Sequence, residues 1–415
     1  MNKHLLLILL AGVFLGFGCN HEKPVEFSTN PQPLENPSFT RQWATSLRGG
    51  GDDPVTAVHV SDQFVFAYRR GGSVSVMDRN NGRLLHVDYP REAAQQIHPP
   101  VVLKDRIIYP TTTYLEVFDF AGRYIPHATK PTDELDKPFS QALDVSIRSD
   151  AVGAGKQLFF GADFPVSGRA VAIDMTRPYV PQLWTLMTPG SDVSSAPALL
   201  KDVVYVASEN GKVMAVATDS REPIWTLEGA TFATYGGVVG NLAADTTGVY
   251  VASLDTKLYC LHRTTGKVHW QYFAGVPLKE GPILTKNLIY QMVPGEGLAA
   301  IDKNPPAGSK NSGTNREARW TAADAVAFAS EDDNYTYVRT SGNQIAAIDK
   351  KTGQPRFTSR RNDLVAFAPN AKGDGIIYAA TAAGRVMAVR PVLHPGEVGE
   401  LVVAPVAPEP VAMAR

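Results

Sequence analysis

Apolar residues recur along this chain in short alternating or continuous runs, and each run carries an aromatic residue at the same place. VVYVAS and IIYAAT are two examples, rich in the β-branched and aromatic residues that favour β-strands. Polar pairs such as Ser61-Asp62 and Lys201-Asp202 precede the runs, and Asp favours tight turns. Eight runs follow this pattern, with their aromatic residues at Phe66, Tyr109, Phe160, Tyr205, Tyr250, Tyr290, Tyr337 and Tyr378.

These aromatic residues are separated by 43, 51, 45, 45, 40, 47 and 41 residues. A self-similar period in the forties, built from strand-like segments, predicts a β-propeller in which each repeat forms one four-stranded antiparallel blade. A second sequence landmark follows each aromatic strand. It consists of a small apolar residue, then usually an Asp, then a polar turn that often contains Gly, and finally a bulky residue. We expect that bulky residue to pack blade against blade, and it is most often one of the tryptophans, Trp43, Trp184, Trp225, Trp270 and Trp320.

The ends of the repeat array predict how the ring closes. The last repeat lacks its Trp strand, whereas the segment RQWATSL (41–47) is a Trp strand with no repeat in front of it. We therefore expect the N-terminal strand to complete the eighth blade, which removes the open sheet edges of a linear array. The prediction is an all-β, eight-bladed propeller over residues 41–392.

Composition agrees with this fold and restricts the function. No long stretch shows helical periodicity, and 35 Gly and 30 Pro suit many short strands and turns. The formal net charge is −1 with no long block of Lys or Arg, so we expect no nucleic-acid partner. Two stretches lengthen the period: residues 128–146, expected to connect the second and third blades, and residues 303–316 in the sixth.

The N-terminal residues have the pattern of a bacterial lipoprotein signal. A basic start precedes an apolar run over residues 5–17, and Cys19 follows Gly18, so we expect residues 1–18 to be removed and Cys19 to be acylated. The alternative is an ordinary secretory signal with a chance cysteine. Asn20 favours the outer membrane, and the Pro-rich, polar residues 19–40 are predicted to be a disordered tether. The Pro- and Ala-rich residues 393–415 are predicted to be a disordered tail.

No motif for catalysis or metal binding is present in the sequence. The nine histidines are scattered, and no His/Cys cluster has metal-ligand spacing. The recurring Asp residues, such as Asp78 and Asp349, occupy one turn position per repeat, so we interpret them as turn formers and not as a catalytic pair. Cys260 stands where other repeats have Ala, and we expect a small buried core residue.

The pattern A-x-D-x-x-T-G-x-x-x-W resembles the tryptophan-docking repeat of the pyrroloquinoline-quinone (PQQ) propeller superfamily. It is clearest in AAIDKKTGQPRF (346–357) and CLHRTTGKVHW (260–270). One branch, the quinoprotein dehydrogenases, holds PQQ beneath two adjacent disulfide-linked cysteines, with a calcium ion and an Asp base. Adjacent cysteines are absent here, so we expect no PQQ, no metal and no catalytic residues, with a PQQ-dependent dehydrogenase as the alternative.

The other branch is the family of the outer-membrane assembly lipoprotein BamB, which this chain resembles in signal, tether, blade number and length. This resemblance implies a non-catalytic, lipid-anchored scaffold on the periplasmic side of the outer membrane. Its partners would be envelope proteins such as the barrel-assembly machinery, with the propeller itself monomeric within the complex. The rival hypothesis is a propeller that binds a small molecule or glycan at its central funnel, with a mouth lined by Asp53, His98, Ser195 and Glu280.

Overall fold

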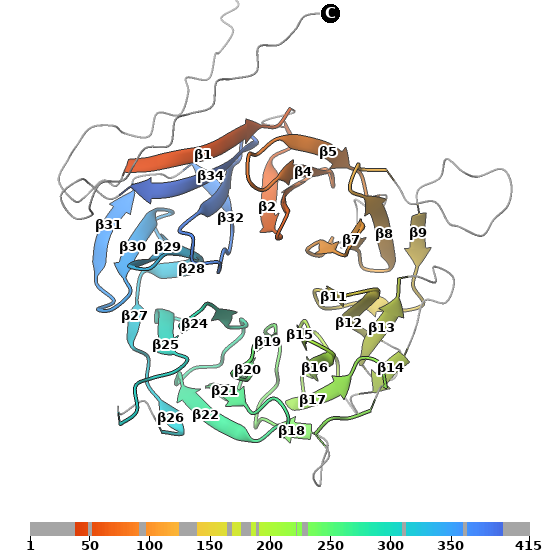
Figure 1. Cartoon of the computed structure of the whole chain (residues 1–415), viewed down its shortest axis with the longest axis vertical. Helices are drawn as coiled ribbons and strands as arrows, with labels where there is room; N and C mark the ends of the chain where they lie inside the picture. The colour runs from red at the N-terminus through yellow and green to blue at the C-terminus, as the bar shows by residue number, and fades with distance from the viewer. Residues whose placement is uncertain are drawn as a thin grey trace, which may run out of the picture.

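The computed structural model is a closed ring of β-sheets that follow one another in chain order around a central opening (Figure 1). It describes residues 38–48, 52–90, 97–123, 139–163, 168–175, 184–187, 191–220, 222–225, 231–308, 313–359 and 363–392. Cys19, the signal segment, most of the predicted tether and the C-terminal tail lie outside these residues. Within the described part of the chain there is no α-helix, and hence none long and apolar enough to cross a membrane.

The eight sheets are the blades of the propeller, which confirms the predicted fold class and blade number. In each of the first four blades the first strand in chain order lies nearest the ring's centre and the last strand lies at its outer edge (Figure 1). The first blade contains β2 (Val55–Val60), β3 (Phe64–Arg69), β4 (Val74–Asp78) and β5 (Leu84–Asp88), and the second contains β6 (Val101–Val102), β7 (Arg106–Pro110), β8 (Tyr114–Asp119) and β9 (Phe139–Ala142). The third contains β10 (Ser146–Ile147), β11 (Val152–Ala154), β12 (Gln157–Asp163), β13 (Arg169–Asp174) and β14 (Trp184–Met187), and the fourth contains β15 (Ala198–Leu200), β16 (Val203–Ala207), β17 (Lys212–Ala217) and β18 (Thr231–Ala233).

The second half of the ring repeats this plan. The fifth blade contains β19 (Ala243–Ala244), β20 (Val249–Ala252), β21 (Lys257–Leu261), β22 (Val268–Phe273) and the short β26 (Asn315–Arg316), and the sixth contains β23 (Ile283–Leu284), β24 (Leu288–Val293), β25 (Gly297–Asp302) and β27 (Trp320–Ala322). The seventh contains β28 (Ala325–Glu331), β29 (Tyr335–Thr340), β30 (Ile345–Asp349) and β31 (Pro355–Ser359), and the eighth contains β32 (Leu364–Ala368), β33 (Ile377–Thr381), β34 (Arg385–Val392) and β1 (Ser38–Ser46).

The N-terminal strand closes the ring as predicted. β1 runs antiparallel to β34, with Ser38 opposite Val392 and Ser46 opposite Arg385. The ring centroids of Trp43 and Tyr378 lie 6.2 Å apart within this blade. Since β1 begins at Ser38, residues 38–40, which the sequence assigned to the tether, belong to the propeller.

The repeated aromatic residue lies in the second strand of every blade and is at most 2% exposed in each case. In blades four to eight its neighbour in the third strand is small: Tyr205 faces Ala215, for example, and Tyr250 faces Cys260. A small neighbour leaves room for the large ring on the same face of the sheet. Cys260 is fully buried, as predicted, and burial raises the pKa of its thiol to about 12.

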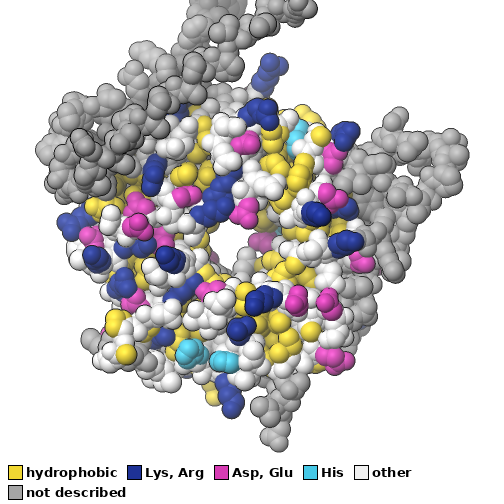
Figure 2. All heavy atoms as spheres, in the orientation of Figure 1, with side chains coloured by type: hydrophobic (Ala, Val, Ile, Leu, Met, Phe, Trp, Pro, Cys, Tyr) yellow, Lys and Arg dark blue, Asp and Glu magenta, His cyan; other side chains and the backbone are white. Residues whose placement is uncertain are grey.

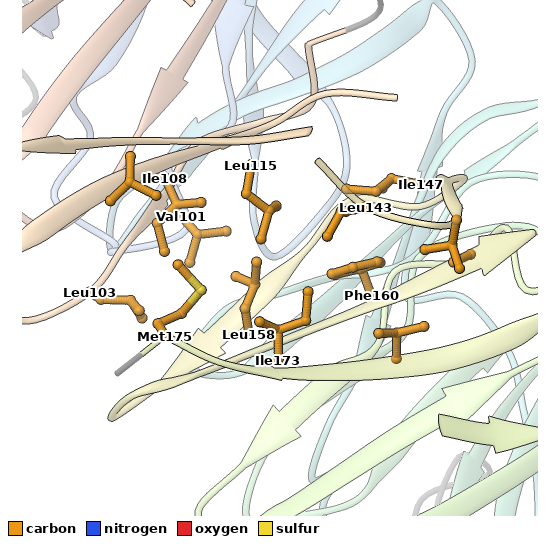
Figure 3. Close-up of a cluster of buried hydrophobic side chains, with 14 residues drawn as sticks. Val101, Leu103, Ile108, Leu115, Leu143, Ile147, Leu158, Phe160, Ile173 and Met175 are labelled. Atoms are coloured by element: carbon orange, nitrogen blue, oxygen red, sulfur yellow. The ribbon is translucent and has the colours of Figure 1, made fainter. Parts of the chain in front are cut away.

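The hydrophobic core lies between successive blades. Figure 3 shows one such cluster, in which Leu115 and Ile108 of the second blade face Leu158, Phe160 and Ile173 of the third. Each sheet therefore buries both faces against its neighbours, and no blade could do so alone.

The antiparallel topology gives the ring two different faces. The upper face, as we call it, carries the beginnings of the first strands and the turns between second and third strands, such as residues 254–256. The lower face carries the turns between first and second strands and those between third and fourth strands. The central opening is visible in Figure 2, where acidic and basic side chains both approach its rim on the face drawn.

The first insert differs from the expectation, and the second agrees with it but makes an additional pairing. Residues Phe139–Ala142, expected in a connection between blades, form the fourth strand of the second blade, with Phe139 opposite Val117, and Ser146 already begins the third blade. The 303–316 insert lies within the sixth blade as expected, but its last residues, Asn315–Arg316, pair in parallel with β22 of the fifth blade.

Candidate binding surfaces of the ring

The four residues predicted to line the funnel all precede a first strand, but their environments differ. Glu280 is exposed, and Asp53 is partly exposed, with its carboxylate accepting from the Gly71 amide at 2.7 Å. Ser195 is fully buried and donates to the carbonyl oxygen of Ala207 at 3.1 Å, so it cannot contact a ligand. His98 is 5% exposed and joins a polar network of its own.

Asp150, which the sequence analysis missed, is the centre of that network. Its carboxylate lies 3.2 Å from Nδ1 of His98 in the second blade and accepts from Nδ2 of Asn241, which precedes the fifth blade, also at 3.2 Å. Asn241 in turn accepts from the amide of Ala196, which precedes the fourth blade. Asp150 lies where the first strand of the third blade is interrupted between β10 and β11. The network therefore links four blades at the upper mouth of the channel.

Two aromatic side chains of the first blade stand beside this network. The Tyr68 hydroxyl donates to the carbonyl oxygen of His98 at 3.0 Å, and the rings of His59 and Tyr68 meet edge to face at 5.0 Å. Burial lowers the pKa of His59, and the nearby Asp150 charge acts in the opposite direction. The half-buried His59 imidazole, near the lower end of β2, thus lies within electrostatic reach of the Asp150 carboxylate, which is 37% exposed.

The tryptophans connect blades by hydrogen bonds as well as by packing. The indole nitrogens of Trp43, Trp225 and Trp320 donate to the carbonyl oxygens of Arg79, Arg263 and Lys350, at 2.8, 3.0 and 2.9 Å. Each acceptor lies in the turn between the third and fourth strands of the next blade. Trp184 begins β14 at the same strand position, but its side chain lies outside the described part of the structure.

The glycine of that turn is required by the docked indole. A Cβ atom on Gly82 would lie 2.3 Å from the ring of Trp43, and the residue has φ +71°, which L side chains rarely adopt. Asp78 supports the same turn by accepting from the amides of Asn80 and Asn81. This agrees with the interpretation of the repeated aspartates as turn formers.

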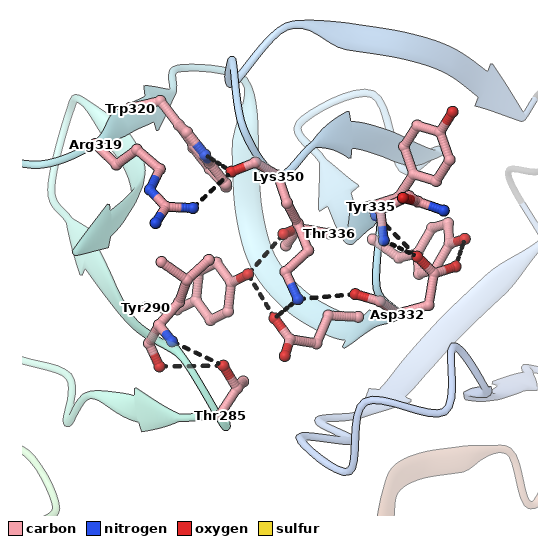
Figure 4. A network of polar contacts seen from close by, with 12 residues as sticks. Thr285, Tyr290, Arg319, Trp320, Asp332, Tyr335, Thr336 and Lys350 are labelled. Carbon is pink, nitrogen blue, oxygen red and sulfur yellow. Dashed lines mark hydrogen bonds and ion pairs between the residues drawn. The ribbon is translucent and has the colours of Figure 1, made fainter. Parts of the chain in front are cut away.

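Blades six and seven are also joined by a buried polar network (Figure 4). The Tyr290 hydroxyl donates to the Glu331 carboxylate across the junction at 2.7 Å. Lys350 Nζ lies 3.0 Å from the same carboxylate, and the carbonyl of Lys350 is the acceptor for Trp320. Burial, the largest cause, and the charge of Glu331 both raise the pKa of Tyr290, so its phenol stays protonated.

Within the described residues, no three His, Cys, Asp or Glu side chains are placed to hold a metal ion together. The groups that could bind another molecule are therefore the polar network around Asp150 and the loops of the two faces. Both suit binding: the network by hydrogen bonds at the channel mouth, and the loops by the surface that they present.

Comparison with known proteins assigns this ring to a family. The sequence profile of the outer membrane protein assembly factor BamB matches residues 40–227 and 231–305, which is more than half of the chain. A search of curated proteins finds no match.

Two solved structures share the fold. BamB from Moraxella catarrhalis is 15% identical, with a TM-score of 0.61, covering 85% of this chain and 97% of that one. The computationally designed Ika8 protein is 14% identical, with a TM-score of 0.60, covering 85% of this chain and 99% of the designed one.

Proposed function

The chain belongs to the family of the outer membrane protein assembly factor BamB, and from this premise we propose that it is a non-catalytic docking scaffold of the bacterial cell envelope. In this role it holds other envelope proteins during the assembly of outer-membrane β-barrel proteins. The observation that carries the proposal is the family match across blades one to five and into the sixth.

The physical properties of the ring support a scaffold. Buried aromatic residues, indole-to-carbonyl bonds and the Tyr290–Glu331 hydrogen bond hold successive blades in fixed positions. A rigid ring presents its loops without reorganisation, which reduces the entropic cost of binding a partner. Membrane tethering would raise the effective concentration of neighbours in the same bilayer, so that weak contacts suffice.

We further propose that Cys19 is acylated and anchors the protein to the outer membrane on its periplasmic side. Residues 20–37 would then form the tether between the lipid and β1. Stable anchoring requires more than one acyl chain, as a fully modified lipoprotein cysteine would supply.

The proposal is tested by affinity purification of the full-length, tagged chain from cross-linked cells. We expect recovery of the barrel-assembly machinery, with the propeller present as a single copy. Recovery of the chain alone, from cells in which an unrelated tagged lipoprotein captures its own known partner, would contradict the scaffold role.

The absence of an enzymatic activity is part of the proposal and needs its own experiment. The purified protein is incubated with PQQ and calcium, then assayed for a bound-quinone absorbance and for alcohol-dependent dye reduction. A stoichiometric quinone signal would favour the quinoprotein dehydrogenase alternative.

A second candidate function is the binding of a small polar molecule or glycan at the upper mouth of the channel. The observation that favours it is the convergence of His98, Asp150 and Asn241 from different blades, with His59 nearby. A clean monomer that retains a small ligand through purification would support this candidate over the scaffold.

A further inference from the structure

The upper mouth of the channel holds one carboxylate that no described Lys or Arg neutralises. Asp150 accepts from Asn241 and lies 3.2 Å from Nδ1 of His98, and no described Lys or Arg lies within ion-pair distance of it. The Asp150 side chain is 37% exposed, whereas that of His98 is buried. A carboxylate offers about four lone-pair positions, so about two remain open to a donor that enters from the mouth.

The backbone around this carboxylate is held in place. Ser149 Oγ donates to the carbonyl oxygen of Asp150 at 2.9 Å and accepts from the amide of Gly161 at 2.7 Å. His98 is fixed in turn, because its amide donates to the carbonyl oxygen of Pro110 at 2.8 Å. The carboxylate is therefore positioned before a ligand arrives, which reduces the entropic cost of binding.

The opposite side of the mouth presents apolar side chains. In blades seven and eight the first strand contains a β-bulge near its upper end, at Val326 and at Val365. These two side chains are 45% and 41% exposed. Each sheet buries both faces against its neighbours, so an exposed side chain of the innermost strand faces the opening. Figure 1 shows β28 and β32 across the opening from β11, β15 and β19.

Two bases of the rim near Asp150 have acidic neighbours of their own. Arg148, two residues before Asp150, pairs with Asp163 at 3.0 Å. Lys279, which precedes the first strand of blade six, is exposed, but Glu280 follows it and is exposed too. This side of the mouth therefore retains the negative charge of Asp150.

Arg339 gives the valine side the opposite charge. Its Nε donates to Oδ1 of Asn343 at 2.8 Å, and its guanidinium carbon lies 5.6 Å from the ring centroid of Phe367 in β32. Phe367 lies two residues after Val365. A cation in the mouth is therefore repelled on the valine side and attracted on the Asp150 side, which orients a ligand that is charged at one end only.

We propose that the upper mouth binds an organic cation, with its ammonium or guanidinium group at Asp150 and its aliphatic stem along Val326 and Val365. Ligand sites are mostly apolar, with a few polar groups that fix orientation, and hydrogen bonds between charged groups are the strong ones. This inference rests on the second candidate function, whose ligand it assigns to a chemical class, and it is independent of the scaffold function.

Saturation-transfer NMR on the purified full-length protein at pH 8 tests the ligand class. The probes are pentylamine, 1-pentanol, which lacks the charge, and methylamine, which lacks the stem. We expect pentylamine to bind at least about tenfold more tightly than either of the other two. Equal binding of pentylamine and 1-pentanol would overturn the inference. Nα-acetyl-lysine amide distinguishes the sources of the cation: tighter binding than pentylamine indicates a polypeptide side chain, and weaker binding indicates a free amine.

N-acetylglucosamine, a neutral sugar, separates this inference from the function on which it rests. If the sugar binds and no amine does, the mouth is a ligand site, but the assigned class is wrong. If neither the sugar nor any amine binds, the second candidate function fails as well, while recovery of envelope partners from cross-linked cells would still support the scaffold.

Variants of the mouth locate the bound cation. Asp150→Asn keeps the shape of the side chain and removes its charge, so we expect pentylamine affinity to fall at least about tenfold, with Asp202→Asn on the lower face unchanged. Val365→Thr should weaken binding about threefold, because a methyl group of the wall becomes a hydroxyl. Its control is Val268→Thr, since Val268 is 40% exposed but lies on β22, away from the channel. Wild-type affinity in a folded Asp150→Asn variant would overturn the inference.

Discussion

The guanidinium carbon of Arg316 lies 4.1 Å from the centroid of the Trp270 ring, between blades five and six. Arg316 Nη1 also donates to the carbonyl oxygens of Asp302 and Lys303, at 2.5 and 2.9 Å. Lys303 follows the turn aspartate Asp302, the same place that Arg79 and Lys350 occupy in their blades. Arg316 thus donates to the carbonyl oxygen of Lys303, and at three other junctions the corresponding carbonyl oxygen accepts from an indole. No described residue accepts a hydrogen bond from Nε1 of Trp270.

This relationship explains how blade six tolerates its insert. The 303–316 segment lengthens the turn on which Trp270 would dock, and the short strand β26 at its end returns to the edge of β22. Arg316 then supplies the hydrogen bond and a cation–π contact in place of the short glycine turn. The junction keeps its contact to the turn although the turn itself has changed.

Replacing Arg316 by Ala should therefore destabilise the ring by about 2–3 kcal/mol, because a cation–π contact and hydrogen bonds from a charged donor to buried carbonyls are lost. Urea unfolding of the purified protein measures this. The control is Arg356→Ala, which removes a surface ion pair of a side chain that is 53% exposed and should cost less than about 0.5 kcal/mol. Equal effects of the two substitutions would contradict the role given to Arg316.

Removing residues 38–47 should have a large effect on the whole ring. The deletion takes away β1, leaves β34 as an open edge and removes Trp43 from its contact with Tyr378 and Arg79. The single substitution Trp43→Ala should already cost about 3–5 kcal/mol. The check is thermal melting, with a chain that lacks residues 393–415 as the control. A deletion variant that melts within a degree or two of the full-length chain would refute closure as a source of stability.

The fold could be predicted from the sequence because each blade repeats its own burial pattern. The buried aromatic residue, the turn aspartate and the docking tryptophan recur locally, so Tyr250 or Trp270 can be recognised without knowledge of the other blades. Ring closure followed from Trp43, which has no repeat in front of it. The fourth strand of the second blade was harder to predict, because it carries Phe139 where other blades carry Trp. It also follows a long segment whose sequence resembles a connection between blades.

The channel network could not be predicted in the same way. His98, Asp150 and Asn241 are far apart in the sequence and meet only because the ring brings blades two, three and five to a common mouth. Ser195 was predicted from its place before a first strand, but the local hydrogen bond to Ala207 turns it inwards. A signal for Asp150 exists only in retrospect: it lies in the short interruption between two strand segments of blade three.

Breaking the buried pair of Glu331 and Lys350 should destabilise the junction of blades six and seven. The two side chains are 3% and 12% exposed. Lys350→Met leaves the Glu331 carboxylate buried without its cation, which should cost about 3–5 kcal/mol. The double variant Glu331→Gln, Lys350→Met removes the charge as well and should recover part of this loss. Urea unfolding of the two single variants and the double variant forms the cycle, and additive effects would exclude coupling between the pair.

Cys19→Ala should release the protein from the membrane if Cys19 carries the lipid anchor. We expect the wild-type chain in the outer-membrane fraction and the variant in the soluble periplasmic fraction, since the acyl chains supply the membrane affinity. Fractionation with immunodetection measures this, and Cys260→Ala is the control for loss of a thiol elsewhere in the chain. A wild-type chain that is already soluble would disprove the anchor.

The stability contributed by Asp150 should depend on pH. Burial alone would raise the pKa of its carboxyl, but hydrogen bonds from His98 and Asn241 outweigh burial and hold the pKa below its ordinary value. A lowered folded-state pKa stabilises the protein above the unfolded pKa of about 3.9, and this contribution is lost as the pH falls through the folded-state pKa. Asp150→Asn should therefore cost about 1 kcal/mol at pH 6, a small effect because the carboxylate is 37% exposed.

Between about pH 5 and pH 3 the difference between wild type and Asp150→Asn should shrink, because protonation removes the wild-type advantage. Urea unfolding at several pH values measures it. The matched control is Asp202→Asn, an exposed aspartate in a turn of blade four on the lower face, for which we expect little difference from wild type at any of these pH values. A difference for Asp150→Asn that stays constant or grows as the pH falls would mean that the charge of Asp150 does not stabilise the channel mouth.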